Sequence, residues 1–171
     1  MGCKGLPALA FAILASALPA AAQDVAPLPA PEGPVILVVN GNVAVTNSEE
    51  GAAFDRQMLE DLGMTELETS TPFTDGVQVF KGVVARKVLE RVGAEGTEVV
   101  AAALNDYTVS LPMSDFENYD VLLATEMNGE EMRVSDKGPI WIVYPRDDHP
   151  ELQERRVSER WVWQLKSLRV Q

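Results

Sequence analysis

Cysteine is almost absent from this sequence of 171 residues, and the single one, Cys3, lies close to the N-terminus. A chain with one cysteine forms no internal disulfide, so the burial of apolar side chains must hold the fold together. Histidine is equally scarce, since His149 is the only one. Zinc and copper sites need several cysteines or histidines, so the composition argues against a metal centre of that kind.

The short motifs of common catalytic sites are also missing. The sequence contains no nucleophile elbow, no phosphate-binding glycine loop and no dinucleotide-binding fingerprint. His149 lies in the polar turn at residues 146–150, where the spacing supplies neither a neighbouring nucleophile nor an orienting partner. We interpret it as a solvated loop residue, and the sequence therefore predicts no self-sufficient catalytic centre.

Long hydrophobic runs are missing except near the N-terminus. Residues 6–18 are apolar, follow Lys4 and precede the small residues 20–22. This pattern is typical of a secretory signal peptide, and the run is too short for a stable membrane span. We therefore expect residues 1–22 to be removed on export, which leaves a periplasmic protein with no thiol and no membrane insertion.

Positive charge is scarce over most of the chain. Residues 1–132 hold 20 acidic and 6 basic side chains, whereas residues 133–171 hold 6 acidic and 8 basic ones. The formal net charge of −12 argues against nucleic acid or an anionic membrane surface as a partner. Any cationic contact is expected in the C-terminal part.

What the sequence does contain is a series of short β-type segments separated by turns. Strands are predicted at residues 35–39, 43–46, 65–70, 99–104, 107–111, 121–127, 140–144 and 161–170. Gly41 marks either a hairpin turn or a bend in one long strand. One short helix is predicted from Asp55 to Gly63 and another from Gly82 to Gly93. These elements predict an α+β, β-rich fold.

The domain organisation follows from proline. Residues 23–34 contain four prolines and no periodic apolar pattern, which predicts an extended arm, either a tether, which we favour, or an arm that docks a partner. The remaining residues, 35–171, are enough for one domain with a substantial core and too few for two.

Two places combine side chains that suit a flat polar ring. Asn105, Asp106 and Tyr107 lie between two predicted strands, either as ordinary turn residues or as a carboxylate and an amide offered at a sheet edge. Trp161 and Trp163 share one face of the last predicted strand. Core packing and stacking on a ligand both remain open for these tryptophans.

Several segments in fixed order resemble the molybdopterin-binding domain of the sulfite oxidase family of oxidoreductases. The segments are residues 80–83, 89–93, 105–107, 109–112, 121–124, 128–130, 137–145 and 158–161. Together they span about residues 35–171, so the resemblance covers essentially the whole predicted domain. It implies a sulfite oxidase-like fold with a groove for a pterin cofactor.

The resemblance also shows two departures. The family holds molybdenum with a cysteine shortly before the Phe-x-Gly segment, and this position falls at Ser70. A serine hydroxyl stays protonated at neutral pH and is a weak ligand for molybdenum. A family arginine expected to contact the cofactor's phosphate falls at Trp141. We therefore expect that the scaffold is kept and that molybdenum is not bound.

Exported, cysteine-less relatives of the PruR type look like pterin-binding proteins that report to a membrane signalling protein. By resemblance, we expect a neopterin- or monapterin-like pterin, no catalysis, and a membrane partner with a periplasmic domain. The expected pterin-binding residues are Ser70, Thr71, Phe73, Asn105, Asp106, Tyr107, Trp141, Ser158 and Arg160.

In this interpretation, Asp106 accepts hydrogen bonds from the pterin's amino group and ring N–H. Arg160 donates to the carbonyl or to the side-chain hydroxyls, and Phe73 or Trp141 stacks on the ring. Two alternatives stay open. One is a true molybdopterin-dependent oxidoreductase that anchors its metal without cysteine, and the other is a structural or adaptor domain with an empty groove.

Overall fold

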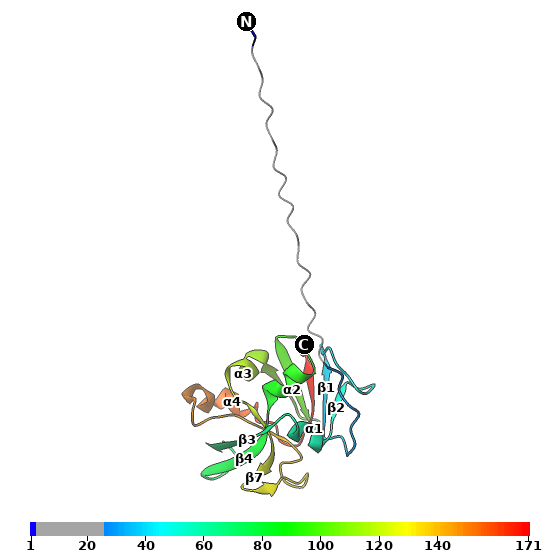
Figure 1. Cartoon of the computed structure of the whole chain (residues 1–171). Coiled ribbons are helices and arrows are strands. Elements are labelled where there is room, and N and C mark those ends of the chain that lie inside the picture. Colours follow the sequence, from blue (N-terminus) through cyan, green and yellow to red (C-terminus); the bar gives the residue numbers. More distant parts are fainter. Residues whose placement is uncertain (3–25) are drawn as a thin grey trace.

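The computed structural model describes residues 1–2 and 26–171. Most of the predicted signal peptide, Cys3 included, lies outside the described residues. In the described part, ten strands form two sheets with a few short helices around them, which confirms the α+β, β-rich fold class (Figure 1).

The first sheet joins the two ends of the domain. Its strand order is β2-β1-β10-β5-β6, and β1 pairs in parallel with β10 while the other pairs are antiparallel. Figure 1 shows β1 beside the red C-terminal strand. The strands are β1 (Leu37–Gly41), β2 (Ala52–Phe54), β5 (Glu98–Ala103), β6 (Thr108–Pro112) and β10 (Leu165–Val170).

The second sheet is antiparallel throughout. Its order is β3-β4-β7-β8, and β9 also pairs with β7. One cluster of buried apolar side chains, which includes residues of both sheets, forms the core. The strands are β3 (Met64–Ser70), β4 (Val77–Val84), β7 (Leu122–Met127), β8 (Glu130–Glu131) and β9 (Trp141–Val143).

The helices are short, and only the first begins where the sequence predicts. The Asp55 carboxylate accepts a hydrogen bond from the Met58 amide at 2.9 Å, and Gly63 follows with a φ of +91°. No helix of the described residues is long and apolar enough to cross a membrane. The helices are α1 (Arg56–Glu60), α2 (Ala85–Arg91), α3 (Met113–Asn118), α4 (Arg155–Ser158) and the 3-10 helix η1 (Pro150–Gln153).

Three predicted element boundaries are wrong. Gly82 lies inside β4 and α2 begins only at Ala85, because the chain stays paired with β7 through this point. Residues 43–46 form no strand, since Val43 makes only an isolated bridge, and Gly41 simply ends β1. The last strand begins at Leu165, because the chain turns at Gln164 with a φ of +52°.

The predicted arm lies against the domain over its described part. Arg91 donates to the carbonyls of Ala26 at 2.8 Å and Pro27 at 2.7 Å. The amides of residues 32 and 33 both donate to the Asp55 carboxylate at 2.8 Å. The hydrogen bond from the Met58 amide, followed by those from Gly33 and Glu32, lowers the pKa of Asp55. Residues 26–34 are therefore tied to the domain by hydrogen bonds at both ends.

Candidate functional site

A cavity of about 430 Å³ lies among the β3–β4 loop, the β5–β6 loop, α4 and the segment that leads into β10. Its volume falls within the range of small-molecule sites. The lining residues are Phe73, Ala103, Asn105, Tyr107, Arg155, Ser158, Glu159, Trp161, Val162 and Trp163.

Aromatic rings form much of the cavity wall. Phe73 and Trp163 meet edge to face, with ring centroids 4.9 Å apart. Trp161 is almost fully buried, whereas Phe73 is 41% exposed and Tyr107 45% exposed. Because Phe73 and Tyr107 are half exposed and line the cavity, their rings are available to stack on a flat heterocycle.

Hydrogen bonds tie the β5–β6 loop to the residues that follow α4. The Tyr107 hydroxyl donates to the Glu159 carbonyl at 3.0 Å, and the Tyr107 amide donates to the Asn105 side chain at 3.1 Å. Within the part of the chain that the structure describes, the side chains of Arg155 and Glu159 form no ion pair. One positive and one negative residue of the lining therefore have no ion-pair partner among the described residues.

A buried cluster holds this wall in place. Asp115, which is 5% exposed, accepts hydrogen bonds from Arg160 at 2.7 Å and from the Tyr144 hydroxyl at 2.9 Å. Burial, and then the neighbouring Asp115 carboxylate, raises the pKa of Tyr144 well above its usual value. Its hydroxyl therefore stays protonated and remains a donor. Through Arg160, the cluster fastens the cavity wall to α3.

The structure brings together four of the nine predicted pterin-binding residues. These four line the cavity: Phe73, Asn105, Tyr107 and Ser158. The other five do not line it: Ser70, Thr71, Asp106, Trp141 and Arg160.

Two of the expected ligand contacts are engaged elsewhere. The Asp106 carboxylate is exposed and accepts a hydrogen bond from Lys166 at 2.8 Å, which lowers its pKa. Arg160 donates into the protein, to Asp115. In the structure Asp106 therefore pairs with Lys166 and Arg160 pairs with Asp115, and neither residue lines this cavity.

Trp141, expected to stack on the ligand, does not line the cavity. It is fully buried and packs at 6.1 Å from Trp161 and 6.4 Å from Trp163, measured between ring centroids. Lys137 lies over its ring, 5.5 Å from the centroid. A ring buried in this way supports the wall but cannot stack on a ligand.

Ser70 and Thr71 do not line the cavity, and their hydroxyls make hydrogen bonds within the protein. The Ser70 hydroxyl donates to Asp147 at 2.5 Å and accepts from Arg146 at 2.7 Å. The Thr71 hydroxyl accepts from the Phe73 amide at 3.0 Å, a local turn that orients the loop carrying Phe73.

These groups do not fit a molybdenum ion. The Ser70 hydroxyl directs its proton to a carboxylate and accepts a hydrogen bond from a guanidinium, so it is a poor replacement for a thiolate. The rings and polar groups of the cavity, by contrast, suit a pterin.

Residues 56–147 match the model of the family described as the oxidoreductase molybdopterin binding domain. The match covers more than half of the chain. The chain belongs to this family. A search of curated proteins found no match. The resemblance to the molybdopterin-binding domain is thus confirmed, and membership of this family suggests a pterin-type cofactor.

The family match includes only part of the cavity. It contains Ser70, Phe73 and the β5–β6 loop, but it ends at residue 147. Arg155, Glu159 and Trp163 all lie beyond that end and line the cavity. The wall that carries the two unpaired charges is therefore outside the segment shared with the family model.

We expect Ser70→Ala to destabilise the fold by about 1–2 kcal/mol, because it removes a bond to Asp147 and a bond from Arg146. Hydrogen bonds from Ser70 lower the pKa of Asp147, so they stabilise the fold above the pKa of the unfolded chain. This contribution is lost as the pH falls through the lower folded pKa. Urea unfolding at several pH values should therefore show a deficit that shrinks below about pH 4.

Ligand affinity provides the control for this variant. Because Ser70 does not line the cavity, Ser70→Ala should bind pterins as the parent protein does. A deficit that grows at acid pH would contradict the role assigned to Asp147. A large loss of pterin affinity would place Ser70 back in the site.

Proposed function

We propose that this protein is a periplasmic pterin-binding domain without redox catalysis, which reports the occupancy of its cavity to a membrane partner. One observation carries the proposal. The cavity combines half-exposed rings with an open anion and cation, whereas Ser70, at the position of the family's sulfur ligand, has its hydroxyl bonded to Asp147. These observations support the binding of a pterin and give no support for the binding of molybdenum.

The cavity's side chains match the edges of a pterin ring. A pterin presents an amino group and a ring N–H on one edge, and a carbonyl and a hydroxyalkyl side chain elsewhere. In this proposal Glu159 accepts from the N–H groups, which makes charge-assisted hydrogen bonds. Arg155 donates to the carbonyl, and Phe73 or Tyr107 stacks on the ring. Asn105 and Ser158, also in the lining, bind the hydroxyls.

A pterin without phosphate fits better than the complete molybdopterin. The lining holds one cation, Arg155, and one anion, Glu159, so the cavity offers no net positive charge to a phosphate. The position expected for a phosphate-binding arginine holds the buried Trp141. An uncharged hydroxyalkyl pterin of the neopterin or monapterin type is therefore the proposed ligand.

Neopterin binding and metal content together test the proposal. All three tryptophans of the chain lie at the cavity wall or directly behind it. Neopterin should therefore quench intrinsic fluorescence and raise the melting temperature, since a ligand bound only by the folded state stabilises it. Stoichiometric molybdenum in protein from a molybdenum-replete periplasm would instead indicate a molybdoenzyme. No thermal shift with any pterin would indicate an adaptor domain.

Glu159→Gln is expected to weaken neopterin binding about tenfold or more, because it removes the charge from the hydrogen bonds to the ring N–H groups. Isothermal titration measures this change. Asp106→Asn is the matched control, since Asp106 lies between the lining residues Asn105 and Tyr107 but pairs with Lys166 and is not itself in the lining. It should leave the affinity unchanged. The reverse pattern would restore Asp106 as the pterin acceptor and remove Glu159.

A further inference from the structure

Three concavities, apart from the cavity above, lie next to one another along residues 130–139. Their volumes are about 770, 770 and 810 Å³. The first two share Glu131, Met132 and Arg133 in their linings. The second and third share residues 36, 134 and 139. Because neighbouring linings share residues, the three concavities form one stretch of adjoining hollows on the surface. We refer to this surface as the 130–139 groove.

One end of the 130–139 groove is apolar. Val35, Leu104 and Val134 line it and are 48%, 45% and 54% exposed. Few other large apolar side chains among the described residues are exposed to this degree. Contiguous exposed apolar side chains mark surfaces that become covered by another molecule.

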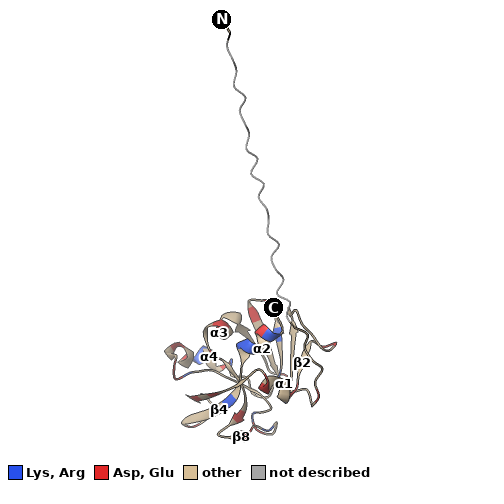
Figure 2. Cartoon of the chain, in the orientation of Figure 1, with Lys and Arg blue, Asp and Glu red and all other residues tan. Residues whose placement is uncertain are grey.

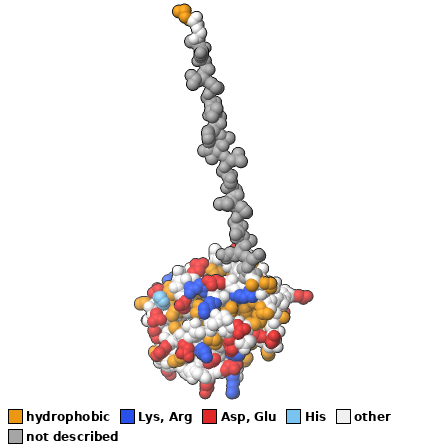
Figure 3. All heavy atoms as spheres, in the orientation of Figure 1, with side chains coloured by type: hydrophobic (Ala, Val, Ile, Leu, Met, Phe, Trp, Pro, Cys, Tyr) orange, Lys and Arg blue, Asp and Glu red, His pale blue; other side chains and the backbone are white. Residues whose placement is uncertain are grey.

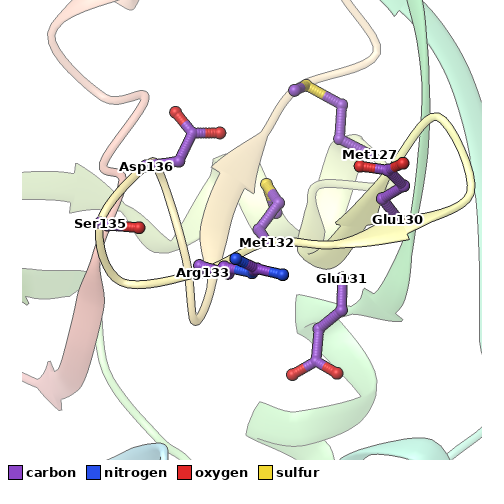
Figure 4. Close-up of a pocket in the computed structure, with 7 residues that line it drawn as sticks. All are labelled: Met127, Glu130, Glu131, Met132, Arg133, Ser135 and Asp136. Carbon is purple, nitrogen blue, oxygen red and sulfur yellow. The ribbon is translucent and has the colours of Figure 1, made fainter.

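The other end of the 130–139 groove is acidic. Glu32, Glu60, Glu130, Glu131 and Asp136 contribute to the lining, against two arginines, Arg56 and Arg133. Arg56 is paired with Glu131 at 2.6 Å and Asp136 with Lys137 at 3.2 Å, which leaves Glu32, Glu60 and Glu130 against Arg133. Figure 4 shows the carboxylates of Glu130, Glu131 and Asp136 spread around Arg133, with two methionine side chains among them. Figure 2 shows acidic positions on both α1 and β8, which border this end. The local charge favours a cationic occupant.

The apolar end of the groove is held in shape by Gln164. Its side chain donates to the Val134 carbonyl at 2.7 Å, and its amide donates to the Lys137 carbonyl at 2.9 Å. Its carbonyl accepts from the Leu104 amide at 2.8 Å. Gln164 follows Trp163 of the cavity lining. A surface fixed by hydrogen bonds loses little freedom on binding, which favours affinity.

We propose that the 130–139 groove docks an extended segment of a partner protein in which apolar side chains are followed by lysines or arginines. The apolar residues fit the end at Val35, Leu104 and Val134, and the cations fit the acidic end. A second copy of this chain is a poor occupant, because its net charge of −12 repels the acidic end. The inference rests on the proposed function only in taking the partner to be the signalling protein.

Selection of peptides from a displayed random library on the full exported chain tests this inference. The selected peptides should be enriched in lysine or arginine next to apolar residues. Val134→Asp and Glu130→Lys should each weaken a selected peptide about tenfold or more, measured by fluorescence polarisation. The matched controls are Val77→Asp and Glu68→Lys, which change a similarly exposed valine and an exposed glutamate outside the groove. They should leave peptide binding unchanged.

Other outcomes of this experiment overturn the docking proposal. These are no enrichment, enrichment of acidic peptides, or equal losses in the groove and control variants. Neopterin titration of the same variants separates this proposal from the pterin proposal, because the groove variants do not touch the cavity lining. Peptide binding without neopterin binding would sink the proposed function alone, and the converse would sink the docking groove alone.

Discussion

Asp115→Ala is expected to lower the free energy of unfolding by about 3–5 kcal/mol, since removing one partner of a buried ion pair leaves the other charge uncompensated. Asp115 accepts hydrogen bonds from both Arg160 and the Tyr144 hydroxyl. Tyr144 is fully buried and Arg160 is 22% exposed, so little water can replace the lost carboxylate. Urea unfolding followed by circular dichroism measures the loss.

Tyr144→Phe is the matched control for Asp115→Ala. It removes one hydroxyl from the same cluster, keeps the ring, and leaves the Arg160–Asp115 pair intact, so we expect a cost of about 1 kcal/mol. If Asp115→Ala costs no more than Tyr144→Phe, the ion pair does not anchor the wall. At temperatures where Asp115→Ala remains folded, neopterin affinity should also fall, because residues 158–163 lose their tie to α3.

The strands of this fold could be predicted because their signal is local. Alternating and β-branched residues marked β1, β3, β5, β6, β7 and β9 to within a few residues of their observed bounds. The helix α3 was missed because it follows Pro112 and has no side-chain cap hydrogen bond to mark its start. The helix α4 was missed because its four residues are too few for a periodic apolar pattern.

The candidate site could be predicted only in part, because its geometry is set by distant segments. Asn105 and Tyr107, which are turn residues between two strands, line the cavity, in keeping with the tendency of such loops to be exposed. The partner of Arg160 lies 45 residues away in the sequence, in a helix that no pattern predicted. Strand alternation assigns Trp141 and Tyr144 to opposite faces of a strand. Both side chains are nevertheless fully buried, so both belong to the core.

Composition alone does not distinguish between two interpretations of the acidic surface. Figure 3 shows acidic, basic and apolar side chains intermingled over one face of the domain. The overall acidity predicts solubility and a cationic partner equally well. The residues that line the 130–139 groove distinguish a surface for a cationic partner from one that serves solubility alone, because apolar side chains lie there beside one acidic cluster.

Gly82→Ala is expected to destabilise the domain by about 3 kcal/mol, the upper end of the usual cost of overpacking. A Cβ at this position would stand 2.1 Å from the Leu123 carbonyl oxygen and 2.6 Å from the Ala124 Cα. Both contacts are backbone atoms of β7, so only a shift of one strand relieves them. Urea unfolding of Gly82→Ala and its control, Gly33→Ala, measures the effect.

In Gly33→Ala the new Cβ meets only the Asp55 side chain, at an ordinary contact distance of 3.5 Å, so its stability should stay close to that of the parent. Equal unfolding midpoints for the two variants would show that β4 and β7 can separate at little cost. The expected difference in stability would give a structural reason for the glycine of the Phe-x-Gly segment at residues 80–82. Gly82 permits the close approach of β4 and β7. Phe80 lies on β4, and its ring centroid is 5.3 Å from that of Trp141 on β9, which also pairs with β7. Such a contact is needed by the scaffold whether or not a metal is bound, which is why its presence does not predict redox catalysis.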